Sequence, residues 1–188
     1  MKKFELTTEF ITNFLGTKLF RIKALVEFGK VEKGELGGFV EKEENLDHDG
    51  DAWVSGDAMV YGNARVSGNA EVYGDAEVYG NARVYGDAMV YGNAWVSGNA
   101  RVSGDAWVSG DQMYAAVKGF GSEYRNTTFF ITKDGNVCVN CGCFSGTLEQ
   151  FREKVEETHK DTKYAKEYLM IADLMEMHFK EELEKIKK

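Results

Sequence analysis

A six-residue repeat fills the middle of this 188-residue chain and limits the folds that are open to it. Ten consecutive copies of Gly-[Asn/Asp]-Ala-x-Val-[Tyr/Ser] begin at Gly50 and continue to the copy that starts at Gly104. An eleventh copy, at residues 110–115, is degenerate. Chance would not keep alanine and valine in phase over this length, so the repeat indicates one structural unit that stacks on itself.

Each repeat has the pattern of one short extended strand followed by a corner. Alanine and valine lie two residues apart, so they face one way and the variable residue between them faces the other. Glycine with Asn or Asp forms the corner, because these residues accept left-handed backbone conformations. Three strands and three corners close one coil. The sequence therefore predicts a parallel β-helix of about three and a third coils, stacked about 4.8 Å apart.

The variable position sorts into three columns, because residues eighteen positions apart lie on the same face of such a stack. One column is basic and holds Arg65, Arg83 and Arg101, each preceded two residues earlier by Asn. The other two carry acidic and large apolar side chains, which are Trp53, Glu71, Met89 and Trp107 in one and Met59, Glu77, Trp95 and Met113 in the other.

These columns supply the candidate binding residues. Exposed tryptophan and methionine on a flat strand face are typical of an interface, which makes Trp53, Trp95, Trp107, Met59 and Met89 candidates for contact with a second copy or with a partner. Guanidinium groups about 5 Å apart repel one another unless anions or carboxylates lie against them. The Arg65, Arg83 and Arg101 column therefore predicts a phosphate-rich ligand, a neighbouring subunit's carboxylates, or a simply solvated face. The repeat could also act only as a rigid spacer.

The flanks predict a cap at each end of the coil. Residues 1–49 form an N-terminal β cap, in which a strand at 18–26 pairs with residues 3–7, and residues 50–115 form the β-helix. Residues 116–188 form a third segment. In it, residues 127–132 and 136–140 flank Lys133-Asp134-Gly135 and predict a β-hairpin.

Two helices are expected after this hairpin. The capping box from Thr147 to Gln150 predicts a helix that ends near Thr158. A second helix begins near Asp161 and frays from Glu181 onward. It carries an apolar stripe at helical spacing that consists of Tyr164, Tyr168, Ile171, Leu174, Met175, His178 and Phe179.

Composition narrows the function. The net charge of −8 argues against binding to nucleic acid or to a membrane surface, and no segment has the length and apolarity of a membrane span. Three cysteines, Cys138, Cys141 and Cys143, form no paired framework and favour a reducing cytoplasm. With His159 as the only conceivable fourth ligand, their spacing does not match a zinc site. We therefore expect neither metal nor cofactor, and a packing role for the three thiols.

The repeat resembles the hexapeptide-repeat family, in which an aliphatic residue is followed four places later by a small one, as Val54 is by Ala58 and Val60 by Ala64. The resemblance implies a left-handed coil, and a homo-oligomer, either a trimer or a dimer. Acyltransferases of this fold use a histidine base, and its γ-type carbonic anhydrases use three histidine ligands. The clean repeats contain no histidine, and His48, at the start of the first coil, is the remaining candidate base.

The chain as a whole is similar to a group of hexapeptide-repeat proteins from phages and prophages that are often labelled transferases from the repeat alone. The similarity rests on residues 20–25 (FRIKAL), 37–46 (GGFVEKEENL), 141–148 (CGCFSGTL), 157–159 (ETH) and 164–169 (YAKEYL). Together with the rigid patterned surface and the missing catalytic groups, this similarity leads us to expect a non-enzymatic accessory protein of the host cytoplasm that binds a host, defence-related protein through the faces of its β-helix. The alternatives are sequestration of a small anionic ligand such as a nucleotide by the arginine face, and acyl transfer.

Overall fold

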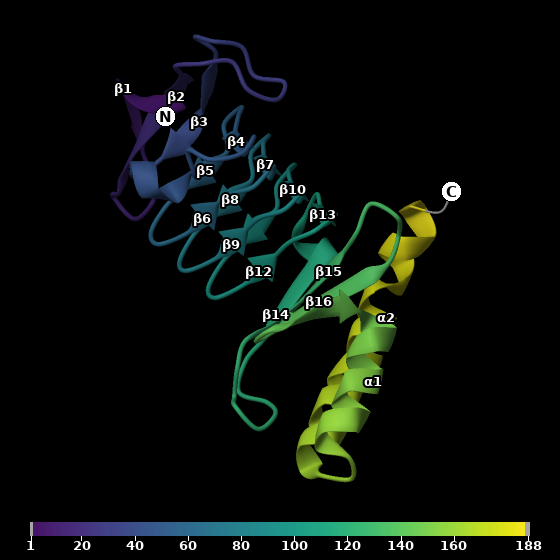
Figure 1. Ribbon diagram of the computed structural model, residues 1–188. Helices are drawn as coiled ribbons and strands as arrows, with labels where there is room; N and C mark the ends of the chain where they lie inside the picture. The colour runs from purple at the N-terminus through teal and green to yellow at the C-terminus, as the bar shows by residue number, and fades with distance from the viewer. Residues whose placement is uncertain (1, 187–188) are drawn as a thin grey trace. The chain divides into compact units, whose positions relative to one another are not determined.

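The computed structural model describes residues 2–186, which form two compact units. The first unit runs to Asp105 and also includes Ser109–Asp111, and the second comprises Ala106–Val108 and the chain from Gln112 onward. The chain is mainly β. A β-solenoid with its N-terminal cap makes the first unit, and a small antiparallel sheet with two helices makes most of the second (Figure 1).

The solenoid of the first unit is a stack of two-residue parallel strands in three columns. Each strand pairs with the strand eighteen residues away, so that Arg65 lies against Arg83 and Arg83 against Arg101. The predicted register of the three columns is confirmed. The strands are β4 (Trp53–Val54), β5 (Met59–Val60), β6 (Arg65–Val66), β7 (Glu71–Val72), β8 (Glu77–Val78), β9 (Arg83–Val84), β10 (Met89–Val90), β11 (Trp95–Val96) and β12 (Arg101–Val102).

The repeat residues take two different roles in each coil. Every repeat alanine and valine from Ala52 to Val102 has an exposed fraction of 0%, and these side chains fill the interior. The repeat glycines from Gly50 to Gly104 hold φ values of 62 to 75° at the corners. The expectation that Asn and Asp share this left-handed conformation is wrong, because no repeat Asn or Asp has a positive φ. Their side chains instead bond along the stack, as Asn63 Nδ2 does to Asn81 Oδ1 at 3.2 Å.

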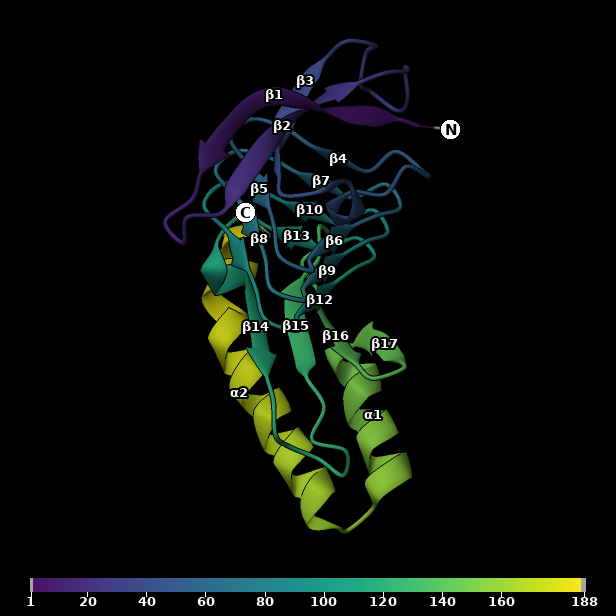
Figure 2. The same ribbon diagram turned by 90° about the vertical axis from the view of Figure 1, so that its left-hand side faces the viewer.

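A three-stranded cap continues into the solenoid at its N-terminal end (Figure 2). Strands β1 (Phe4–Thr12) and β2 (Lys18–Ala24) pair antiparallel, which confirms the predicted strand pairing, and β3 (Leu36–Val40) follows. The stack begins before the repeat does. Strand β3 pairs in parallel with β5, and Leu46 forms a parallel bridge with Val66, so the solenoid has about 4 turns.

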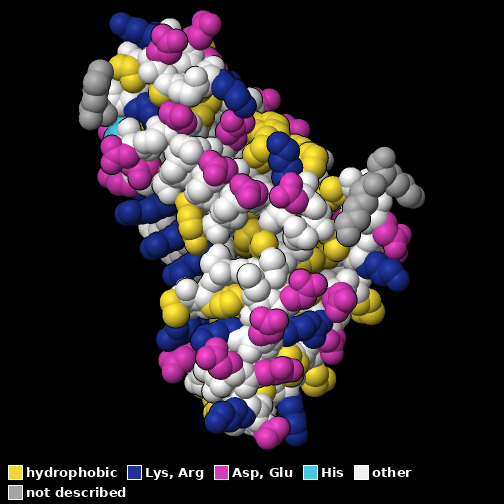
Figure 3. Space-filling model, turned by 45° about the vertical axis from the view of Figure 1, so that its right-hand side comes forward, with side chains coloured by type: hydrophobic (Ala, Val, Ile, Leu, Met, Phe, Trp, Pro, Cys, Tyr) yellow, Lys and Arg dark blue, Asp and Glu magenta, His cyan; other side chains and the backbone are white. Residues whose placement is uncertain are grey.

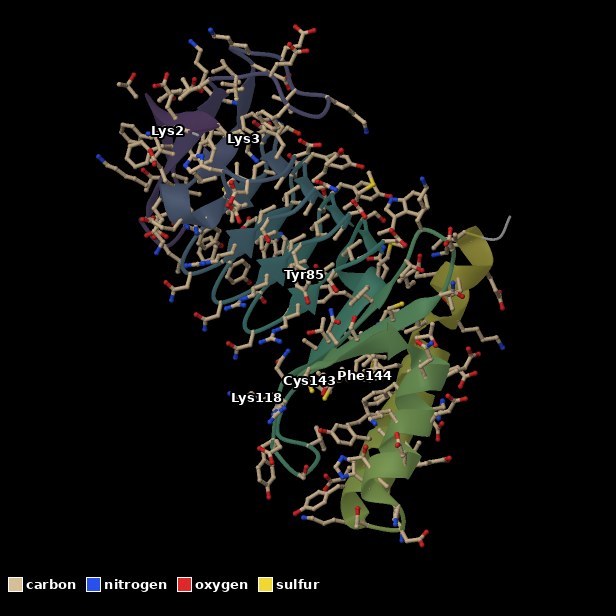
Figure 4. All side chains as sticks on the ribbon, in the orientation of Figure 1. Lys2, Lys3, Tyr85, Lys118, Cys143 and Phe144 are labelled. Carbon is tan, nitrogen blue, oxygen red and sulfur yellow. The ribbon has the colours of Figure 1, made fainter. Side chains whose placement is uncertain are left out.

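Side chains cover the open backbone at this end of the solenoid. The ammonium group of Lys3, labelled in Figure 4, donates to the carbonyl oxygens of Gly50 at 3.1 Å and Ala52 at 2.9 Å. Burial lowers the pKa of Lys3 from its usual range. Asn45, which is fully buried, donates to two further carbonyls of the same coil. The unpaired edge that an open solenoid end would expose is thus satisfied.

The degenerate eleventh repeat does not continue the columns. Its residues form a 3₁₀ turn, Asp111–Met113, and then a strand of the second unit's sheet. Met113, expected to follow Trp95 on an outer face, is buried within the turn. That expectation is wrong because the repeat here lacks the alanine and valine that fill the interior.

The second unit is a four-stranded antiparallel sheet with two helices. Its strands lie in the order β14 (Tyr114–Val117), β15 (Thr127–Ile131), β16 (Val137–Cys141) and β17 (Phe144–Thr147), and β13 (Trp107–Val108) belongs to the same unit. The predicted hairpin is confirmed, since Ile131 pairs with Val137. The capping box is confirmed as well, and α1 (Leu148–His159) begins after Thr147, whose hydroxyl accepts from the Gln150 N–H at 3.2 Å.

The stripe on α2 (Lys163–Ile186) is confirmed only in part. Tyr168, Ile171, Met175 and Phe179 are buried as expected, whereas Leu174, 48% exposed, and His178 are not. The buried face includes Ala165 and Ala172 instead, because small side chains let the helix backbone lie close to its neighbours. Fraying was expected from Glu181 to the last residue, but the helix continues to Ile186, and residues 187–188 lie outside the described part of the chain.

Candidate functional site

The most distinctive surface of the solenoid is its column of arginines. Strands β6, β9 and β12 place Arg65, Arg83 and Arg101 in register, and all three side chains are exposed. Adjacent strands lie about 4.8 Å apart, so these charges are close neighbours. Among the residues that the structure describes, neither Arg65 nor Arg83 forms an ion pair with a carboxylate.

The arginines line a groove of about 620 Å³. This volume falls within the range of small-molecule sites, which is about 300–1,000 Å³. The space-filling view in Figure 3 shows basic side chains in a row along one edge of the solenoid, beside a group of acidic side chains. The other lining residues are Glu43, Glu44, Leu46, Asp47, His48, Val66, Ser67 and Tyr85.

One end of this groove is acidic. The 3₁₀ turn Glu43–Asn45 and the bridge of Leu46 to Val66 place Glu43, Glu44 and Asp47 next to the first arginine strand, β6. A hydrogen bond from the Lys2 ammonium group, 2.5 Å long, holds the pKa of Glu43 below its usual range. The groove is therefore bipolar, with carboxylates at one end and guanidinium groups along the rest.

His48 lies at the acidic end with its ring partly held in place. Its Nδ1 accepts from the backbone N–H of Lys3 at 3.2 Å, and its ring stacks on Phe4 at 4.4 Å between centroids. Its Nε2 lies 3.8 Å from a carboxylate oxygen of Glu43. This histidine, a candidate base from the sequence, thus lines the same groove as the arginines.

The last residue of each repeat forms a second set of columns, which the sequence analysis did not sort. In two of these columns tyrosines stack almost parallel: Tyr61 with Tyr79 at 5.1 Å and 3°, and Tyr73 with Tyr91 at 5.0 Å and 8°. The third column borders the arginine groove. There Tyr85 lies between Ser67 and Ser103. The eighteen-residue spacing that sorted the variable position could have revealed this difference.

The tryptophan and methionine candidates do not form one surface. Trp53, expected to be exposed, is 5% exposed because the N-terminal cap covers it, with the Phe28 ring packed edge-on at 5.4 Å. Met89 is half-buried, and so is Trp107, which lies in the second unit. Trp95 is exposed, at 47%.

Met59 and Trp95, with Glu77 between them, line a second groove of about 740 Å³ on the face formed by β1, β2, β3, β5, β8 and β11. Met59 packs on the cluster of Leu19, Phe39 and Tyr61. Four carboxylates, Glu9, Asp57, Asp75 and Glu77, line this groove together with a single basic residue, Arg21. The second groove is therefore acidic with an aromatic end.

The cysteines and histidines of residues 2–186 do not come together as a metal site. Within residues 2–186, no group of three His, Cys, Asp or Glu side chains is placed to hold a metal ion. Cys138, Cys141 and Cys143 are free thiols, and Cys141 Sγ lies 3.2 Å from the Thr127 hydroxyl. Nor does this part of the chain contain a helix with the length and apolarity needed to cross a membrane.

Comparison with known proteins agrees with the stacked coils. The chain is a β-solenoid repeat protein. A family model described as the YdcK beta solenoid repeat matches five stretches of it, residues 52–68, 58–74, 76–92, 82–98 and 94–110. The search of curated proteins found no match.

Proposed function

We propose that this protein acts by stoichiometric binding and that its arginine groove holds an anionic, phosphate-bearing ligand. The observation that carries the proposal is the in-register column of Arg65, Arg83 and Arg101 along a groove of about 620 Å³. Like charges at this spacing repel one another, and within residues 2–186 neither Arg65 nor Arg83 has an ion pair that would relieve the repulsion. A bound polyanion would relieve it.

The scaffold suits this role. Guanidinium groups bind phosphate through paired, charge-assisted hydrogen bonds, which are stronger than neutral ones. Each arginine follows a fully buried alanine and precedes a fully buried valine, so the backbone that carries it is fixed before the ligand arrives. Binding therefore has to order the arginine side chains but not the backbone that carries them.

Calorimetric titration with inorganic tripolyphosphate tests the proposal. We expect binding that weakens as salt rises, and a loss of roughly tenfold or more in Arg83→Gln, since a hydrogen bond to a charged group contributes about 1.5–3 kcal/mol. Arg125→Gln is the matched control, because Arg125 is an exposed arginine of the second unit. Failure of the unmodified protein to bind tripolyphosphate, or equal losses in both variants, would remove the proposal.

A second candidate function is binding of a host protein through the other groove. Trp95 is a large aromatic side chain that is 47% exposed, and the carboxylates of Asp57 and Asp75 lie beside it in the same groove. Aromatic residues with a charged rim are typical of protein interfaces. The charge of the rim favours a partner with a basic segment.

This candidate has its own test. Affinity purification from host lysate should recover a partner with the unmodified protein and with Arg83→Gln, but not with Trp95→Ser. Truncation of a central aromatic residue at an interface often costs 2 kcal/mol or more, which is about thirtyfold in affinity. A partner retained by Trp95→Ser and lost by Arg83→Gln would place the interface on the arginine face instead.

The proposal has finer parts that rest on resemblance. They are a left-handed coil of the hexapeptide-repeat type, assembly as a trimer or dimer, and an origin in a phage or prophage with a site of action in the host cytoplasm. The repeat supports the first two parts, and the similarity of the flanking segments supports the third. Acyl transfer at His48 is the enzymatic alternative.

A further inference from the structure

The tyrosine columns show where a ring is missing beside the arginine groove. In the other two columns a second tyrosine lies 5.0 or 5.1 Å from the first, nearly parallel to it. The coil spacing sets this distance, because tyrosines eighteen residues apart lie in adjacent coils. Tyr85 has a serine in both neighbouring coils, so its own column supplies no second ring.

The open side of Tyr85 faces the groove. Tyr85, labelled in Figure 4, and Ser67 both line the groove. Ser103, on the other side, is 6% exposed and does not line it. A tyrosine ring at position 67 would therefore lie in the groove, which Arg65 also lines.

We infer that the ligand carries a flat aromatic ring, which stacks on Tyr85 over Ser67 while its phosphates lie on the arginines. Ser67 lies two residues after Arg65, just beyond the end of β6, and both residues line the groove. Their Cα atoms are therefore at most about 7 Å apart. Ring and phosphate must therefore be joined by a linker of this length. A nucleoside phosphate, in which a sugar separates base from phosphate, fits this requirement. The inference rests on the proposed function.

The acidic end of the groove supports the same ligand class. The carboxylates of Glu44 and Asp47 lie beyond β6, on the side away from Arg83 and Arg101. Carboxylates accept hydrogen bonds from amino and hydroxyl groups and repel phosphate. A base or sugar at this end donates hydrogen bonds to the carboxylates, and phosphates directed toward Arg83 lie away from them. A bare polyphosphate leaves the acidic end without donors.

Substitution Ser67→Tyr tests the inference with adenosine triphosphate and inorganic tripolyphosphate as probes. The new ring should stack on Tyr85, as Tyr61 does on Tyr79, and fill the slot. We expect the unmodified protein to bind the nucleotide roughly five- to a hundredfold more tightly than tripolyphosphate, since base stacking on an aromatic side chain has this magnitude. Ser67→Tyr should remove that preference and leave tripolyphosphate binding unchanged.

Two further variants complete the experiment. Ser97→Tyr is the control, because it adds a ring at the same repeat position next to Tyr79, after β11 and away from the arginine column. It should change neither affinity. Tyr85→Ser removes the stacking partner and should give the same loss as Ser67→Tyr, so the test survives misfolding of either variant.

The outcomes separate the inference from the proposed function. Equal binding of both probes by the unmodified protein overturns the stacking inference and leaves the anion site in place. Nucleotide binding that is unaffected by Ser67→Tyr and by Tyr85→Ser also overturns the stacking inference and leaves the anion site in place. If the unmodified protein binds neither adenosine triphosphate nor tripolyphosphate, the proposed function and the inference are overturned together.

Discussion

Substitution of Gly86 by alanine should lower the free energy of unfolding by about 3 kcal/mol or more. Gly86 holds φ at +75°, a conformation that costs L-residues about 1–2 kcal/mol. An added Cβ would also lie 2.9 Å from the backbone nitrogen and 3.3 Å from the Cα of Gly104, in the next coil. Backbone atoms cannot rotate away as a side chain can, so the two coils must separate locally. Urea denaturation followed by circular dichroism measures the loss.

Gly104→Ala is the matched control for this prediction. Gly104 lies in the same column with φ at +62°, yet no atom lies within 4 Å of an added Cβ. We expect only the conformational cost there, about 1–2 kcal/mol. The difference between the two variants measures the close approach of adjacent coils. Equal losses would mean that backbone conformation alone selects glycine at the corners.

Substitution of Asn45 by leucine should destabilise the solenoid by about 3 kcal/mol or more. Asn45 is fully buried, and its Nδ2 donates to the carbonyls of Gly62 at 3.2 Å and Ala64 at 2.8 Å. Its Oδ1 accepts from the Lys42 N–H at 3.0 Å. Leucine leaves these three backbone groups without partners, and each buried unpaired group costs about 1–3 kcal/mol. The same denaturation measurement gives the result.

The comparison for this variant is Asn63→Leu. Asn63 lies one coil further along the same column, but its side chain is exposed, donates to Asn81 Oδ1 and accepts from Lys42 Nζ at 3.5 Å. Water replaces these bonds when they are lost, so we expect a change of about 1 kcal/mol or less. A similar loss in both variants would show that Asn45 stabilises the coil by something other than capping its end.

The stacked part of the fold could be predicted because its interactions repeat. Arg65, Arg83 and Arg101 occupy identical positions in successive coils, so their register follows from counting along the chain. The position of Tyr85 between two serines of its column follows from the same count along the sequence. Periodic residues thus reveal their neighbours without knowledge of the rest of the chain.

The remaining parts of the site depend on contacts between segments that share no period. Phe28 covers Trp53 because the loop after β2 folds over that face, and no pattern in residues 25–35 relates the loop to the repeat. The acidic end of the groove likewise depends on the bridge from Leu46 to Val66. Sequence spacing gave Glu43 and Asp47 no position relative to the arginines.

The eighteen-residue coil also constrains how this chain could change in length. A duplication or deletion of three whole repeats adds or removes one layer, and it lengthens or shortens the groove by about 4.8 Å while every later side chain keeps its face. A change of one repeat instead turns all later residues by one face, so that the arginines beyond it would fall on a different wall from those before it. Length variants that preserve the groove should therefore differ by multiples of three repeats, and the length of the arginine row could evolve in steps without any new fold.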